Sequence, residues 1–290
     1  MMMANMNGAL LMIASMACFT LNDAFLKATN GDLPLFQLLF LRGILATVFI
    51  GFLAHGNNAW QFDIPRRDWM LIGIRSMAEV AAAFFFVTAL LNMPLANATA
   101  ILQMLPLMLT LGSAVFLREA VGWRRFAAIG VGFIGMLLIV RPGADGFSIW
   151  SIFALLAVVC VTVRDLSTRR MSARVPSLLV TFAASFSVLV TSGLACLFTE
   201  WAPVTPQLGG MVLAAAVFII GGYFFSVHVM RAGDVSFIAP FRYTGLIWAL
   251  VLGWLFFGDW PSPLTFLGAG LIVATGLFTF YRERQLMAAS

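Results

Sequence analysis

Long apolar segments follow one another along almost the whole chain, and this feature decides what the chain can fold into. A helix needs roughly 20 mostly apolar residues to cross the hydrocarbon core of a bilayer. Segments of that kind recur from end to end, separated by short connections with turn residues. The sequence therefore predicts ten transmembrane helices, over residues 7–28, 34–54, 69–91, 94–117, 124–141, 147–169, 176–198, 208–231, 235–257 and 263–281.

Composition excludes a soluble protein. The chain is 62% hydrophobic and 10% charged, whereas soluble domains are about 45–50% apolar and about 25% charged. The runs are continuously apolar and lack the alternation of a transmembrane β-barrel. A helix satisfies its own backbone hydrogen bonds, which a bilayer requires. The predicted fold class is therefore an all-α integral membrane protein.

Charged residues in the connections predict the orientation. Cytoplasmic loops of membrane proteins carry an excess of Lys and Arg. With the N-terminus inside, eleven basic residues fall on the cytoplasmic side, and only Lys27 and Arg141 fall outside. Both termini are therefore expected in the cytoplasm. Basic clusters such as Arg66-Arg67 are too short to follow a phosphate backbone, so no nucleic-acid partner is expected.

The two halves of the sequence resemble each other. A shift of 142 positions aligns the first predicted helix with the sixth, and a shift of 140 aligns the end of each half. We interpret residues 1–143 and 144–290 as two repeats of five helices. The matched pairs are Cys18 with Cys160, Asp23 with Asp165, Lys27 with Arg169, and Glu119 with Asp259.

An odd number of helices per repeat inverts the second copy relative to the first. Inverted repeats of this kind are typical of secondary transporters. Two copies of opposite orientation can exchange conformations, which gives outward-open and inward-open states of similar energy. Duplication that served folding alone is the competing interpretation.

Several charged residues lie within the predicted helices. A charge at the centre of a transmembrane helix costs at least about 2.5–3.5 kcal/mol on insertion scales, so it usually faces a partner or a water-filled cavity. Arg75 and Glu79 are four residues apart and can pair on one helical face. Glu79 is the deepest acid and, with Asp23, the candidate carrier of a coupling proton. The residues predicted for coupling or gating are Asp23, Arg42, Arg75, Arg164 and Asp165.

The fourth helix of each half is predicted to be interrupted and to carry the substrate site. Pro106 and Pro240 break these two helices, and interrupted helices in corresponding places point to a transport site. Arg242 has no charged neighbour in sequence, so it needs a substrate oxygen or an acid on another helix. The residues predicted to contact substrate are Gln103, Arg242, Tyr243, Trp248 and Glu79.

Short motifs recur along nearly the whole chain and together are specific for one kind of fold. They are Asn22-Asp23 with Lys27, Leu41-Arg42-Gly43, residues 95–100 running to Pro106, Phe116-Leu117-Arg118-Glu119, Arg141-Pro142-Gly143, residues 239–243, and Phe256-Phe257-Gly258-Asp259. Through these motifs the chain resembles the ten-helix EamA branch of the drug/metabolite transporter superfamily. The resemblance implies a central cavity lined by helices 1, 3, 4, 6, 8 and 9.

Within that family the chain looks most like bacterial proteins of riboflavin uptake, because of its Asn22-Asp23 start and the stretch 238–244. This resemblance implies a multi-pass protein of the bacterial inner membrane. Other members of the family handle S-adenosylmethionine, amino acids or metallophores, and these substrates stay open.

Other classes of protein fit the sequence less well. An intramembrane aspartyl protease would need Asp23 and Asp165 to meet, but the predicted topology places them near opposite faces. An ATP-driven pump would need a phosphate-binding loop, which the sequence lacks. The three cysteines have no metal-type spacing, so neither a metal nor a cofactor is expected. The expected partners are a small-molecule substrate and the lipid bilayer, and the sequence leaves open whether the chain forms a homodimer.

Overall fold

The structure is a computed structural model that describes residues 2–118, 122–141, 148–172, 174–229 and 238–289. Within these ranges ten helical stretches are long and apolar enough to cross a bilayer, which confirms the predicted spans. Residues 230–237, at the junction of the eighth and ninth spans, lie outside the described part. The elements are α1 (Met2–Ala28), α2 (Leu35–Gly56), α3 (Arg66–Asn92), α4 (Leu95–Leu102), α5 (Leu105–Phe116), α6 (Trp123–Val140), α7 (Ile149–Arg169), α8 (Ser177–Cys196), α9 (Pro206–Val229), the 3-10 helix η1 (Ala239–Tyr243), α11 (Thr244–Phe257) and α12 (Pro263–Ala289).

Proline and left-handed residues set the ends of these helices. Pro34, Pro65 and Pro94 immediately precede α2, α3 and α4 with ψ of 141°, 144° and 137°. Proline fixes φ near the helical value and removes a donor that a first turn does not need. Gly258 ends α11 with φ of 66°, a left-handed conformation that glycine adopts without strain. The chain can therefore turn back between spans within a few residues.

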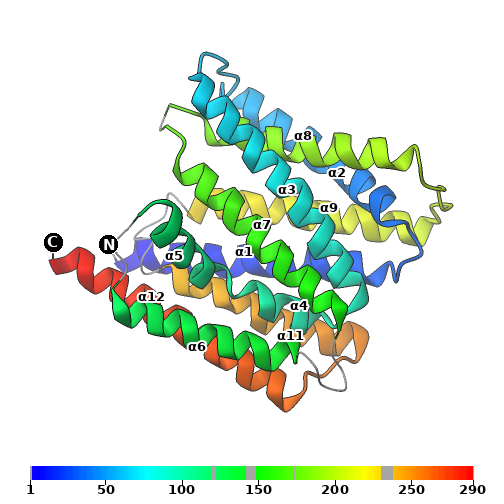
Figure 1. Ribbon diagram of the computed structural model, residues 1–290. Coiled ribbons are helices and arrows are strands. Elements are labelled where there is room, and N and C mark those ends of the chain that lie inside the picture. Colours follow the sequence, from blue (N-terminus) through cyan, green and yellow to red (C-terminus); the bar gives the residue numbers. More distant parts are fainter. Residues whose placement is uncertain (1, 119–121, 142–147, 173, 230–237, 290) are drawn as a thin grey trace.

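The helices form two groups on either side of a central pair (Figure 1). α1 and α7 run through the middle, with α2, α3, α8 and α9 on one side and α6, α11 and α12 on the other. α1 packs against α9 and α11, whereas α7 packs against α3 and α5. α1 begins and α12 ends at the same end of the bundle, as an even number of crossings requires.

The helix contacts come in matched pairs. In this comparison α4 with α5 makes the fourth span and η1 with α11 the ninth. We replace each span by the one five places further along the chain, returning to the first span after the tenth. The α1–α9 contact then becomes α7–α3, the α1–α11 contact becomes α7–α5, and the α2–α9 contact becomes α8–α3, and all of these contacts are present. The contacts α2–α8 and α6–α12 map onto themselves. A two-fold relation between the halves would give such a pattern of contacts.

α6 and α12 approach each other through glycines. A Cβ atom built on Gly135 would lie only 2.7 Å from the carbonyl oxygen of Gly268. Small residues allow backbones of membrane helices to come this close. The last span of each half is therefore packed closely against the other.

Candidate functional site

Oppositely charged side chains of α3 and α7 meet inside the bundle. The Glu79 carboxylate lies 3.3 Å from Arg164 Nη1 and 3.9 Å from Arg75 Nη1. Arg164 Nε donates to Asp165 Oδ1 at 2.8 Å. These four side chains retain between 14% and 27% of their accessible surface. Solvent-sized space therefore reaches these charges, although they belong to membrane-spanning helices.

The same group of charges extends toward α1 and α2. Arg42 Nη1 donates to Asn22 Oδ1 at 3.4 Å, and Asn22 Nδ2 donates to Asp23 Oδ1 at 2.9 Å. Arg42 is also within electrostatic range of both Asp23 and Glu79. The two acids predicted for coupling are thus connected through one arginine.

At the other end, η1 adds a further arginine. Arg242 is within electrostatic range of Asp165 on α7. The sequence left its partner open between a substrate oxygen and an acid such as Glu79, and the acid that interacts electrostatically with Arg242 in the structure is Asp165. We call the side chains of Asp23, Arg42, Arg75, Glu79, Arg164, Asp165 and Arg242 the charge cluster. Acids and arginines alternate along it, so each charge has an opposite neighbour in a medium that solvates ions poorly.

Tyr223 of α9 lies beside the charge cluster, and sequence reasoning did not single it out. Its phenol is within electrostatic range of Glu79, Arg164, Arg42 and Arg75. Its ring packs edge-on against Phe19 of α1, with 5.5 Å between the ring centroids. The sequence signal that could have identified Tyr223 is the rarity of tyrosine, because the sequence contains only three. A phenol in this place offers a substrate both an aromatic face and a hydroxyl.

The two predicted helix interruptions are present. α4 ends at Leu102 and α5 begins at Leu105, so the chain leaves the α-helix at Gln103 and Met104. In the second half, η1 gives way to α11 between Tyr243 and Thr244. Under the shift of 140 these two junctions coincide. Both fourth spans therefore change helical geometry at equivalent sequence positions.

Three elements converge at Gly245, the second residue of α11. A Cβ atom built there would lie 3.7 Å from both Gln103 Nε2 and Met16 Sδ. Thr20 Oγ1 of α1 donates to the Met16 carbonyl of its own helix at 2.8 Å and lies 3.5 Å from the Gly245 carbonyl. Gln103 therefore projects between α1 and α11. Trp248 follows one turn further along α11 and is half-buried.

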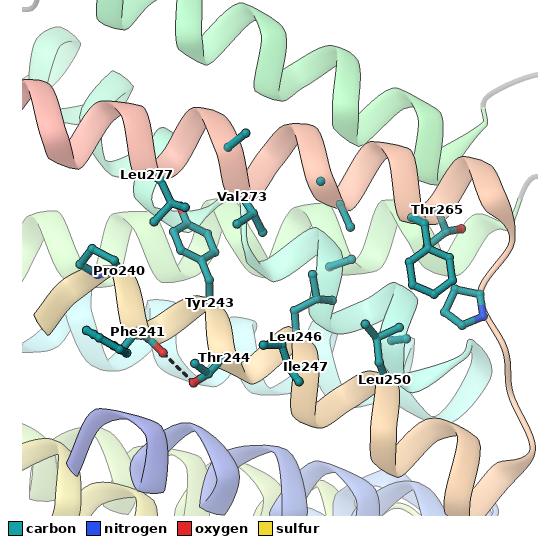
Figure 2. Close-up of a pocket in the computed structure, with 17 residues that line it drawn as sticks. Pro240, Phe241, Tyr243, Thr244, Leu246, Ile247, Leu250, Thr265, Val273 and Leu277 are labelled. Atoms are coloured by element: carbon teal, nitrogen blue, oxygen red, sulfur yellow. Dashed lines mark hydrogen bonds between the residues drawn. The ribbon is translucent and has the colours of Figure 1, made fainter. Parts of the chain in front are cut away.

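Tyr243 points the other way, toward α12 (Figure 2). It lines an apolar groove of about 530 Å³ between η1, α11 and α12, with α4 at its floor. Its hydroxyl lies against Gly276, and its ring packs edge-on with Phe280 at 6.4 Å between centroids. Among the described residues that hydroxyl has no hydrogen-bond partner. Gln103 and Tyr243 thus point into different spaces, because the tighter turn of η1 changes side-chain direction and Gly276 leaves room for the phenol.

The chemistry of the charge cluster follows from its arginines and carboxylates. Across the residues that the structure describes, no three His, Cys, Asp or Glu side chains gather closely enough to hold a metal ion. The arrangement can instead hold a polar organic molecule. Arginine forks bind planar oxygen-bearing groups with two parallel hydrogen bonds, and carboxylates accept from donors on the same molecule.

Comparisons with known proteins identify the family and the fold. The profile of the EamA-like transporter family matches twice, over residues 6–141 and 148–281. A pseudopaline exporter of Pseudomonas aeruginosa is 26% identical over 92% of this chain and 93% of its own. An S-adenosylmethionine uptake transporter of Rickettsia prowazekii is 23% identical, covering 98% and 96%. A riboflavin transporter of Vibrio cholerae is 30% identical, covering 64% and 62%. One solved crystal structure superimposes with a TM-score of 0.67 at 20% identity over 96% of this chain and 98% of its own.

Proposed function

This chain belongs to the EamA-like transporter family, and from that premise we propose that it moves riboflavin by alternating access. It is a multi-pass membrane transporter and not an enzyme. The charge cluster carries the proposal, because partly accessible charges inside a membrane bundle are what a polar substrate requires. A flavin combines a flat aromatic ring with a polar edge, which suits Tyr223 and the neighbouring arginines.

Relatives with other named substrates supply the alternatives. They include transporters of S-adenosylmethionine and of pseudopaline. A thermal-shift screen of the purified protein separates the three ligands. Riboflavin is expected to raise the unfolding temperature, and the increase should be absent in Arg242→Ala. If only S-adenosylmethionine raises the unfolding temperature, S-adenosylmethionine and not riboflavin is the substrate.

The two proposed repeats comprise residues 1–143 and 144–290, and the proposed substrate site lies between them. Glu79 and Arg242 belong to the charge cluster, and Gln103 projects between α1 and α11 beside Gly245. Substrate contact by Trp248 stays a prediction. Tyr243 faces α12, so any contact it makes would require η1 to turn. The matched helix contacts support the inverted arrangement of the repeats.

Both chain ends are proposed to lie in the cytoplasm of a bacterial inner membrane. The bias of eleven basic residues against two supports this orientation. Reporter fusions test it, because alkaline phosphatase is active only outside and a fluorescent protein only inside. A fusion at Ala144 is expected to report outside and one at Ser290 inside. Two fusions on the same side would contradict the inverted repeat as well.

Asp23 and Glu79 are the proposed carriers of a coupling proton. Asp23 accepts a hydrogen bond from the neutral amide of Asn22, whereas Glu79 is paired with two arginines. A group that binds and releases a proton in each cycle works best without a close ion pair, and Arg42 interacts with Asp23 only electrostatically, without a salt bridge among the described residues. This favours Asp23. Asp23→Asn is expected to leave substrate binding measurable and make uptake independent of pH. Unchanged pH dependence in both Asp23→Asn and Glu79→Gln would exclude this role for either residue.

A further inference from the structure

Lys27 joins three helix ends at one face of the bundle. It lies in the last turn of α1, and its ammonium donates to the carbonyls of Leu90 at 3.3 Å and Met93 at 2.9 Å, at the end of α3. It also lies 5.4 Å from the ring centroid of Phe257, at the end of α11. The last carbonyls of a helix lack partners and carry partial negative charge, so a cation is held well there. We call these contacts the α1 gate.

Arg169, in the last turn of α7, also joins helix ends. Its Nη1 donates to Ser113 Oγ of α5 at 3.1 Å, and Ser113 is 2% exposed. The adjacent Arg170 donates to the carbonyl of Phe116, the last residue of α5. Two neighbouring cations therefore fix the end of α7 to the end of α5. We call these contacts the α7 gate.

The two gates correspond in their cation and in one helix contact, although the hydrogen bonds of Lys27 go to α3 and that of Arg169 goes to α5. Lys27 and Arg169 coincide under the shift of 142. The α1–α11 and α7–α5 contacts exchange when five spans are counted onward. Because five is odd, α1 and α7 cross the membrane in opposite directions, and the gates lie at opposite faces. The charge cluster lies between them on α1, α2, α3, α7 and η1.

We propose that Lys27 and Arg169 are positioning residues for transport, each of which holds one end of the substrate pathway closed. This inference rests on the proposed alternating access. Each gate consists of a few hydrogen bonds from flexible cationic side chains near the membrane surface, so water can replace them when the end opens. Water cannot replace apolar packing contacts deeper in the bundle in the same way. Release of one gate is then coupled to closure of the other.

The sequence provides a direct probe, because Lys27 is its only lysine. A membrane-impermeant succinimidyl ester acylates a free amine, and the rate at Lys27 follows by peptide mass spectrometry. In Arg169→Ala the α7 gate is weakened, so the α1 gate should close more of the time. Acylation of Lys27 is expected to slow by about fivefold or more, the lower end of typical coupling between two sites. Arg174→Ala, which changes an exposed arginine of the same connection, is the matched control and should leave the rate unchanged.

The reverse experiment moves the probe to the other gate. The double variant Lys27→Arg/Arg169→Lys keeps a cation at each gate and should retain transport. Its single lysine now reports on the α7 gate. Lys27→Ala combined with Arg169→Lys should slow acylation there by a similar factor. If the substitutions only loosened the fold, acylation would become faster in both experiments, at Lys27 and at the lysine introduced in Arg169→Lys.

Unchanged or faster acylation in either experiment would overturn the coupled gates, provided that the variants elute as single species in size exclusion. Neither experiment needs a substrate. If the rates change as expected and riboflavin is not transported, the gates stand and only the proposed substrate fails. If riboflavin is transported and the rates do not respond, transport stands and the gates fail.

Discussion

Arg164→Ala is expected to abolish transport and to lower the stability of the protein markedly. Arg164 connects Glu79 of α3 with Asp165 of α7, at 3.3 Å and 2.8 Å. Its removal leaves two acids without their shared cation. Truncating one partner of a fully buried ion pair costs about 3–5 kcal/mol, and the partial exposure of these side chains, between 19% and 27%, places the expected cost below that range. The unfolding temperature in detergent and uptake into vesicles measure the two effects.

A double-mutant cycle identifies the interaction responsible. Glu79→Gln removes one of the acids that Arg164 neutralises. The double variant Glu79→Gln/Arg164→Gln should therefore lose less unfolding free energy than the two single variants lose together. Such coupling is expected only for residues in contact. Additive losses would show that Arg164 stabilises the bundle through its packing and not through Glu79. Thr181→Ala on α8 serves as a control, because the Thr181 hydroxyl is exposed and bonds only within its own helix.

The second large effect concerns Arg242. Arg242→Ala is expected to reach the membrane at near-normal levels and to transport about 10- to 100-fold more slowly, as loss of a charged hydrogen bond of roughly 1.5–3 kcal/mol predicts. Arg242→Lys should rescue little, because an ammonium cannot reproduce the planar fork. Initial uptake rates normalised to surface expression measure the change.

Arg282→Ala is the matched control for Arg242. The Arg282 guanidinium donates to Gln285 on the exposed end of α12, away from the charge cluster. Its removal should leave uptake intact. Normal transport by Arg242→Ala would place the substrate elsewhere and leave Arg242 as a structural partner of Asp165.

Hydropathy and helix periodicity predicted more of the fold than of the site. Apolar length alone located the ten spans, since a bilayer accepts few alternatives to a helix of that length. The i, i+4 spacing predicted the pairing of Arg75 with Glu79, and the two are 3.9 Å apart. Pro106 and Pro240 predicted the two interruptions. Each of these inferences depends on residues that are near each other in sequence.

The contacts that sequence could not supply join distant segments. The bond between Arg164 and Glu79 links residues 85 positions apart, and it depends on how α3 packs against α7. Tyr223 reaches the charges from α9 for the same reason. Tyr243 turned away from the predicted place, because the 3-10 geometry of η1 and the space beside Gly276 set its direction. Periodicity assigns a residue to a helix face but does not identify the helix opposite.

Counterflow in proteoliposomes tests the central claim most directly. Vesicles that contain the purified protein are loaded with unlabelled riboflavin and diluted into a trace of labelled riboflavin. Saturable accumulation of label is expected, and it should be lost in Arg242→Ala and retained in Arg282→Ala. Accumulation no greater than in protein-free vesicles, with riboflavin and with S-adenosylmethionine alike, would contradict transport of either metabolite through the charge cluster.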